Sequence, residues 1–105
     1  MKLFVDDIRT PVDSSWEIAR TVDQAIDLIK KALFYGESLD HISLDHDLGD
    51  DQTSRALVNW MVSHGIRFEY GSVHSANPVG VQWLEMALNR DFGDPIPIVT
   101  APAYQ

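Results

Sequence analysis

The sequence predicts a single α/β domain built around a parallel β-sheet, and three observations support this. Five short apolar segments alternate with three helical patterns, which is typical of parallel sheets joined by crossover helices. The 105 residues are enough for one domain with a real core. Hydrophobic residues make up 45% of the chain, the usual share for a globular protein, so disorder is excluded.

The five strands are expected at residues 2–5, 16–20, 41–44, 68–73 and 96–99. Side chains alternate between the two faces of a strand, so Leu3 and Val5 share one face and Phe4 lies on the other. The segment between the first two strands, 10–15, is too short for a full crossover helix. The last strand is expected at an edge of the sheet, because Pro95 and Pro97 restrict its pairing.

The three helices carry recognisable start and stop signals. A capping box, residues 21–24, opens the first helix, and Gly36 ends it. The second is expected over 52–64, capped by Asp51 or Thr53 and stopped by Gly65. Asn77 followed by proline is a strong signal for the start of the third, which is expected to run to about residue 90.

Composition excludes several classes of function. The chain has no cysteine, so thiolate catalysis and thiolate zinc sites are excluded. Its formal charge of −8 argues against a broad nucleic-acid surface. The first strand begins almost at once, leaving no room for a signal peptide, and no apolar run reaches membrane-spanning length. We therefore expect a cytoplasmic protein that is not attached to a membrane.

Titratable side chains follow three of the predicted strands, at the point where each strand ends. Asp6 and Asp7 follow the first strand, the run Asp45-His46-Asp47 the third, and His74-Ser75 the fourth. Ligands of parallel sheets bind beyond the carboxyl ends of the strands, so these groups are expected to meet at one edge. Clustered carboxylates repel one another, and Mg²⁺, or Mn²⁺ in its place, would relieve the repulsion.

The remaining polar residues of this region have simpler interpretations. Asp47, Asp50 and Asp51 are expected to be turn and cap residues. The run from Asp45 superficially suggests a calcium-binding loop, but its twelfth position is Ala56 instead of glutamate. The other two histidines, His41 and His64, are expected to be structural, and the three tryptophans to lie in the core or an interface.

The runs LFVDDIR, ISLDHDLGD and HSANPVG resemble receiver domains of two-component systems, and more closely the cyclic-phosphate processing receiver domains. The resemblance covers nearly the whole chain. It implies a receiver-like (flavodoxin-like) fold, a five-stranded parallel sheet of order 2-1-3-4-5, here with the first and last helices reduced or absent. It also implies that Asp6, Asp7 and Asp45 hold Mg²⁺, and that the ligand is a cyclic phosphate of a nucleotide or an RNA end.

One receiver feature is missing. The lysine that follows the fifth strand in receivers would fall near residues 100–102, but the lysines of this chain are Lys2, Lys30 and Lys31. Arg9 and two histidines lie near the predicted site instead. The departure argues against ordinary phosphorelay and favours the diverged family.

The expected reaction assigns a role to each group. Opening a cyclic phosphodiester needs charge stabilisation, an activated water and a protonated leaving group, so Asp45, His46 and His74 are the candidate catalytic residues. Free backbone N–H groups after Pro78 suit a phosphate. The candidate phosphate-binding residues are Arg9, Ser75, Asn77 and Gly80. Alternatives remain: both histidines could instead support the carboxylates through hydrogen bonds, Arg9 could merely pair with Asp7, and Asn77 is first of all a cap.

Three functions are compatible with these residues. The first is a metal-dependent phosphoesterase acting on cyclic phosphates, which makes the protein an enzyme. The second is a signalling receiver or pseudo-receiver phosphorylated on Asp45, and the third is a sensor that binds a phosphorylated nucleotide without turnover.

The predicted topology leaves one face of the sheet without helices. Right-handed crossovers place all three helices on the other face, although parallel sheets are normally covered on both. A partner copy, the C-terminal tail around Tyr104 or another domain could cover it. We expect a homodimer through this face.

Overall fold

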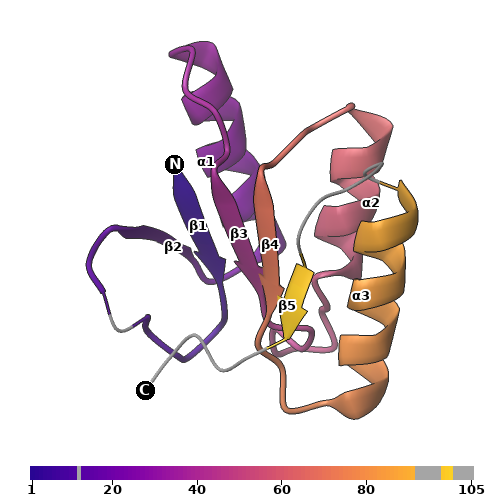
Figure 1. The fold of residues 1–105 in the computed structure, drawn as a ribbon. Helices are drawn as coiled ribbons and strands as arrows, with labels where there is room; N and C mark the ends of the chain where they lie inside the picture. Colours follow the sequence, from indigo (N-terminus) through magenta and orange to yellow (C-terminus); the bar gives the residue numbers. More distant parts are fainter. Residues whose placement is uncertain (12, 92–97, 101–105) are drawn as a thin grey trace.

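The computed structural model describes residues 1–11, 13–91 and 98–100, and its centre is a parallel sheet (Figure 1). Four strands lie in the order β2-β1-β3-β4, each parallel to its neighbours. The strands and helices are β1 (Lys2–Val5), β2 (Trp16–Ala19), α1 (Val22–Phe34), β3 (His41–Leu44), α2 (Arg55–Ser63), β4 (Tyr70–Val73) and α3 (Pro78–Asp91). The predicted α/β class and the order of these four strands are thus confirmed.

A further short segment, β5 (Ile98–Thr100), pairs in parallel with β4 at the end of the sheet. Residues 96 and 97 of the predicted strand, and the tail around Tyr104, lie outside the described residues. Among the described helices, none is long and apolar enough to cross a membrane.

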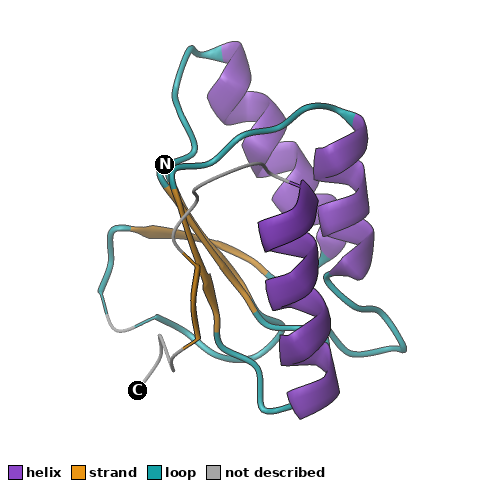
Figure 2. Cartoon of the chain, turned by 45° about the vertical axis from the view of Figure 1, so that its right-hand side comes forward, coloured by secondary structure: helices purple, strands orange, loops and turns teal. Residues whose placement is uncertain are grey.

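The three helices pack together on one face of the sheet (Figure 2). This follows from right-handed crossovers between parallel strands. Alternate strand residues point into the layer between sheet and helices, where Leu3, Val5, Ile42, Leu44 and Val73 are fully buried. Leu3 and Val5 share one face, as predicted, and the five side chains meet apolar side chains of α1, α2 and α3. This layer is the hydrophobic core.

Helix α1 begins at the predicted capping box. Thr21 Oγ1 accepts a hydrogen bond from Gln24 N at 3.1 Å, and Gln24 Oε1 accepts one from Arg20 N at 2.8 Å. The bond to Thr21 satisfies one N–H of the first helical turn, whereas the reciprocal bond from the Gln24 side chain goes to Arg20 N, one residue before the cap. Gly36 lies just beyond the helix with a φ of 76°, as expected of a glycine that ends a helix.

The predicted start of α2 is wrong by three residues. The helix begins at Arg55, and the cap position is taken by Ser54, whose side chain makes no capping bond, instead of Asp51 or Thr53. The cause is the preceding loop, in which Asp50 and Asp51 have φ values of 48° and 61°. Gln52 N donates to Gly49 O at 2.8 Å, so these residues form a tight turn that cannot be helical.

No described helix covers the opposite face of the sheet. Register places Phe4 beside Ser43, and Ser43 beside Ser72, on this face. All three are nevertheless buried. Around them lie Trp16 and His41, whose rings are 4.6 Å apart. The homodimer across this face stays a prediction, which sedimentation of the purified protein would test.

Candidate functional site

The hydrogen-bond ladder of the sheet continues past the strand ends and fixes the backbone of the site. Asp45 N donates to Val5 O at 2.9 Å, and His74 N donates to Leu44 O at 3.0 Å. On the other side of β1, Asp6 N donates to Ala19 O at 3.1 Å. The residues that follow β1, β3 and β4 are therefore held in register at the carboxyl edge of the sheet.

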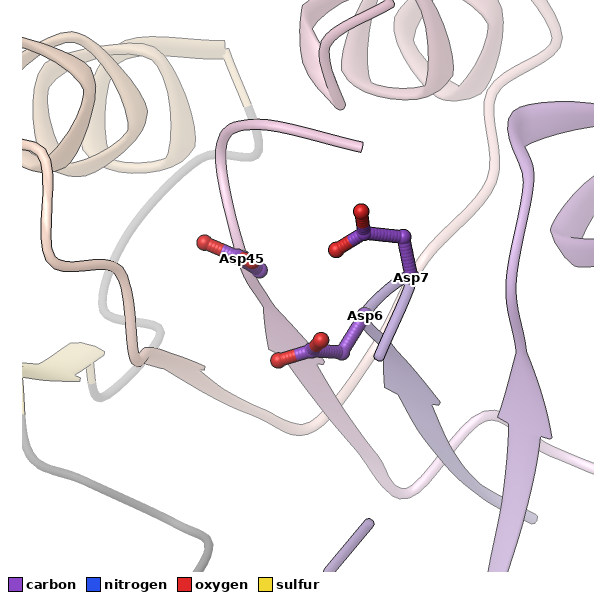
Figure 3. Close-up of side chains that lie close together, drawn as sticks. All are labelled: Asp6, Asp7 and Asp45. Carbon is purple, nitrogen blue, oxygen red and sulfur yellow. The ribbon is translucent and has the colours of Figure 1, made fainter. Parts of the chain in front are cut away.

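Three carboxylates meet at this edge. One oxygen from each of Asp6, Asp7 and Asp45 can be chosen so that all lie within 4.8 Å of one another. Figure 3 shows the side chains next to each other at the ends of β1 and β3. Asp6 is inaccessible to solvent and Asp45 only 6% exposed, whereas Asp7 is half-buried. The structure thus brings together the three predicted metal ligands, and we call them the acid cluster.

The Asp6 carboxylate is held from several sides. Its Oδ1 accepts hydrogen bonds from Ile8 N at 3.0 Å and Arg9 N at 2.8 Å, which form a tight turn after β1. Its Oδ2 lies 3.1 Å from His74 Nε2. The side chain therefore has a fixed direction within the acid cluster.

Asp45 shows the electrostatic cost of the acid cluster. Burial and the neighbouring charge of Asp6 raise the pKa of Asp45, although a hydrogen bond from Ser75 and the charge of Arg9 oppose the shift. Two oxygens, Oδ2 of Asp6 and Oδ2 of Asp45, each lie 3.8 Å from Arg9 Nη1. Arg9 thus lies next to these two aspartates. The sequence had left open a pairing with Asp7 instead. The pKa of Asp45 is raised overall, so Ser75 and Arg9 offset burial and the charge of Asp6 only in part.

His74 is buried against the acid cluster with both ring nitrogens engaged. Its Nε2 lies 3.1 Å from Asp6 Oδ2, and its Nδ1 lies 2.7 Å from Ser43 Oγ. Burial lowers the pKa of His74 to about 4, despite the opposing influence of Asp6. The ring is also stacked on Phe4, with centroids 4.3 Å apart. Of the two roles left open by the sequence, this arrangement favours support of the carboxylate.

Ser43, His74 and Asp6, which are joined by hydrogen bonds, are the residue types of a hydrolase triad, but they cannot act as one. Ser43 is inaccessible to solvent and lies within β3, so no substrate can reach its hydroxyl. The order of nitrogens is also reversed, because the serine contacts Nδ1 and the aspartate Nε2. Ser43 is therefore a hydrogen-bonding partner of His74 and is not a nucleophile.

His46, the other candidate catalytic histidine, is held in a similar way. Its Nε2 accepts a hydrogen bond from Arg55 Nε at 2.8 Å, so the ring proton is on Nδ1, which donates to Asp47 Oδ1 at 2.8 Å. This bond is the main reason that the pKa of Asp47 is lowered. Arg55 itself lies over the Trp83 ring, 4.8 Å from its centroid. His46 thus joins the loop after β3 to α2, and its predicted role in proton transfer stays a prediction.

The structure gives Gly80 a role other than contact with a phosphate. A Cβ at this position would lie 2.6 Å from both Cβ and Nδ1 of His46, far inside van der Waals contact. The space that a side chain would need is filled by the imidazole. Glycine at this position therefore allows α3 to pack against His46.

Asn77 caps α3, as the sequence predicts. Its Oδ1 accepts hydrogen bonds from Val79 N at 3.1 Å and Gly80 N at 3.2 Å, and its Nδ2 donates to Asp47 Oδ2 at 3.2 Å. Val81 N donates to Asn77 O, and Pro78 has no N–H. The expectation of free N–H groups at this end of α3 is therefore wrong, because the cap satisfies them.

Asp47 and the turn residues Asp50 and Asp51 form the rim of the loop after β3. All three are exposed, and Asp47 bridges to Thr53. The positive φ at Asp50 and Asp51 confirms their interpretation as turn residues. Gly49, which precedes them with a φ of 77°, lies against Asp7, since a Cβ there would be 3.2 Å from Asp7 Oδ2. The loop thereby limits the space around the acid cluster.

Two residues of this region were not found by sequence reasoning. Ser43 carried a signal, since it is a polar residue inside an otherwise apolar strand next to the acids. Arg55 carried none, because nothing in the sequence indicates that it bonds to His46 nine residues earlier. The structure places Arg9 and Ser75 at the acid cluster, and Asn77 and Gly80 in the packing of α3 against the loop.

An acid pair after β1 and a third aspartate after β3, at the carboxyl edge of a parallel sheet of order 2-1-3-4, define a receiver-like domain. Comparison with family models agrees with this class. The model of the cyclic-phosphate processing receiver domain matches residues 1–90, and the chain belongs to this family. Neither the curated proteins nor the solved structures gave a match. Every residue of the candidate site falls within the matched region.

Proposed function

We propose that this protein is a divalent-metal-dependent phosphoesterase that acts on cyclic phosphates of nucleotides or RNA ends. The observation that carries the proposal is the acid cluster, with a guanidinium 3.8 Å from two of its members. Membership of the cyclic-phosphate processing family supports the substrate class. Three carboxylates at the carboxyl edge of the sheet do not stabilise a hydrophobic core, whereas a site that processes phosphates needs them to hold a cation.

The donor atoms fit Mg²⁺ or Mn²⁺. All are carboxylate oxygens, which these hard cations prefer, and no thiolate is present in the chain. The raised pKa of Asp45 is a further indication, because its two causes, burial first and then the charge of Asp6, both penalise an ionised carboxylate that a bound cation would stabilise. A divalent cation bound by Asp6, Asp7 and Asp45 supplies Lewis acidity and charge neutralisation at phosphoryl oxygens.

Two of the chain's own groups suit the substrate's phosphate. The Arg9 side chain is 29% exposed, so it can contact an anion while it stays close to Asp6 and Asp45. The Ser75 hydroxyl already donates to Asp45, and Ser75 follows β4 at the same carboxyl edge of the sheet. Together they are expected to orient the phosphoryl group and to stabilise charge on its oxygens.

The test is an activity screen over 2′,3′-cyclic nucleotides with Mg²⁺ or Mn²⁺. We expect metal-dependent ring opening, lost by at least a hundredfold in Asp45→Asn. The matched control is Asp27→Asn, which neutralises an exposed aspartate of α1 and should retain full activity. The proposal would be disproved if Asp45→Asn hydrolysed the cyclic nucleotides at the same rate as wild type.

The two other functions of the same site have different signatures. Covalent labelling of Asp45 by acetyl phosphate would identify a signalling receiver. Stabilisation by a cyclic nucleotide without product would identify a sensor. The absence of lysine near residues 100–102 weighs against the receiver.

A further inference from the structure

Two hydrogen bonds link the acid cluster to the interior of the sheet. They run from Asp6 Oδ2 to His74 Nε2, at 3.1 Å, and from His74 Nδ1 to Ser43 Oγ, at 2.7 Å. The three residues come from positions at or next to the ends of β1, β3 and β4, and all are buried. Phe4 stacks on the imidazole with an interplanar angle of 10°. The ring is thus fixed at both nitrogens and on one face.

The directions of these bonds follow from the groups involved. Asp6 Oδ1 accepts from two backbone N–H groups and Oδ2 lies near Arg9, which are the surroundings of an ionised carboxylate. An ionised carboxylate only accepts hydrogen bonds, so the imidazole proton is on Nε2. A neutral ring then accepts at Nδ1, and the donor there is the Ser43 hydroxyl. A single tautomer satisfies all three residues.

We propose that Ser43 and His74 are positioning residues that hold Asp6 in the direction in which it binds a divalent cation. The proposal rests on the metal binding put forward under the proposed function. Groups that hydrogen-bond to a metal ligand fix its orientation, and their loss commonly weakens metal binding by about 10–100-fold. Here Ile8 N and Arg9 N hold one oxygen of Asp6 and His74 holds the other. Ser43 keeps His74 in the tautomer that donates to Asp6.

The same face of the sheet provides a matched control. Ser72 Oγ lies 2.8 Å from His41 Nε2, so this pair repeats the serine–histidine hydrogen bond. Ser72 is the register partner of Ser43 and is also buried, but His41 stands at the opposite end of β3 from Asp45. Removal of the Ser72 hydroxyl should therefore disturb the sheet as much as removal of the Ser43 hydroxyl, without affecting Asp6.

The experiment measures Mn²⁺ affinity of the full chain by titration calorimetry and by electron paramagnetic resonance. We expect His74→Leu to weaken Mn²⁺ binding by about 10–100-fold. His74→Gln should recover part of this loss, because its amide can still donate to Asp6. Ser43→Ala should weaken binding in the same direction by a smaller factor, and Ser72→Ala should bind as wild type does.

A second measurement needs no variant. Nitrogen-15 chemical shifts of the histidine side chains in the wild-type protein report the tautomer of each ring, and His74 should carry its proton on Nε2. This answer does not depend on whether His74→Leu folds. A proton on Nδ1 of His74 would overturn the proposal.

The remaining outcomes separate the two proposals. If wild type binds Mn²⁺ and the Ser43 and His74 variants bind it equally well, the positioning roles are wrong and the metal site stands. The positioning roles are likewise wrong if Ser72→Ala loses as much affinity as Ser43→Ala. If wild type fails to bind Mn²⁺, the metal site of the proposed function is wrong, and the positioning proposal falls with it.

Discussion

Replacement of Gly80 by alanine provides a sharp test of the packing around the site, because two effects predict opposite signs. Alanine in a helix is favoured over glycine by about 1 kcal/mol, so helix propensity alone predicts a more stable protein. The structure predicts the reverse. The new Cβ would lie 2.6 Å from two atoms of His46, whose ring cannot retreat while Arg55 and Asp47 hold both nitrogens.

The size of the effect follows from these two contributions. Overpacking of a filled site costs about 1–3 kcal/mol, which exceeds the gain in helix propensity. We therefore expect Gly80→Ala to lower the free energy of unfolding by about 1 kcal/mol. For a domain of this size that corresponds to a decrease in melting temperature of about 4–8 °C. Urea unfolding followed by tryptophan fluorescence and circular dichroism would measure it.

A double-mutant cycle identifies the cause. In a His46→Ala background the imidazole is gone, so Gly80→Ala should now stabilise the protein by up to about 1 kcal/mol. The change of sign is the critical result. If Gly80→Ala is neutral or stabilising with His46 in place, the close packing of α3 on this ring is refuted.

Three further predictions concern the acid cluster and its surroundings. The pKa of the Asp45 carboxyl is raised, mainly by burial and then by the charge of Asp6, so its ionised form is unfavourable in the folded protein. Asp45→Asn removes this charge, and in EDTA it should increase the free energy of unfolding by about 0.5–2 kcal/mol. The same variant should lose the Mg²⁺-induced rise in melting temperature, and a loss of stability in EDTA would contradict the electrostatic argument. Burial lowers the pKa of His74 from 6.5 to about 4, so the unfolded chain takes up a proton between these values while the folded protein does not. The contribution of His74 to stability should therefore be complete above pH 6.5 and decrease by up to about 3 kcal/mol as the pH falls to 4, and His74→Gln should reduce the corresponding slope in urea titrations at several pH values. Asn77→Ala removes the cap of α3 and the bond to Asp47, and should cost about 0.5–2 kcal/mol by chemical denaturation. The exposed Asn59→Ala in α2 is its control, and an equal cost in both would argue against capping.

Much of this fold could be predicted because its signals are local. Side-chain alternation placed Leu3 and Val5 toward the helices, and Asn77 with the following proline marked the start of α3. The acid cluster could also be predicted, since parallel strands deliver the residues after them to one edge. In each case the signal in the sequence lies within a few residues of the position concerned.

The parts that could not be predicted depend on partners distant in sequence or on the conformation of a loop. The start of α2 depends on a turn in which Asp50 and Asp51 have positive φ, a choice that helix propensity does not indicate. The role of His74 depends on Ser43 and Asp6, which lie 31 and 68 residues away. Gly80 suggested an approaching phosphate, whereas the group that approaches it is the ring of His46.

The position of Arg9 has a consequence for how ions and anions bind together. Its guanidinium lies 3.8 Å from Asp6 and from Asp45, so an incoming divalent ion finds these carboxylates already partly compensated. We expect such an ion to bind less tightly than it would bind the same carboxylates without the guanidinium. An anionic ligand attracts the guanidinium toward itself and leaves more of the carboxylate charge for the ion. We therefore expect the proposed metal and a phosphate ligand to reinforce each other's binding, each raising the affinity of the other by the same factor.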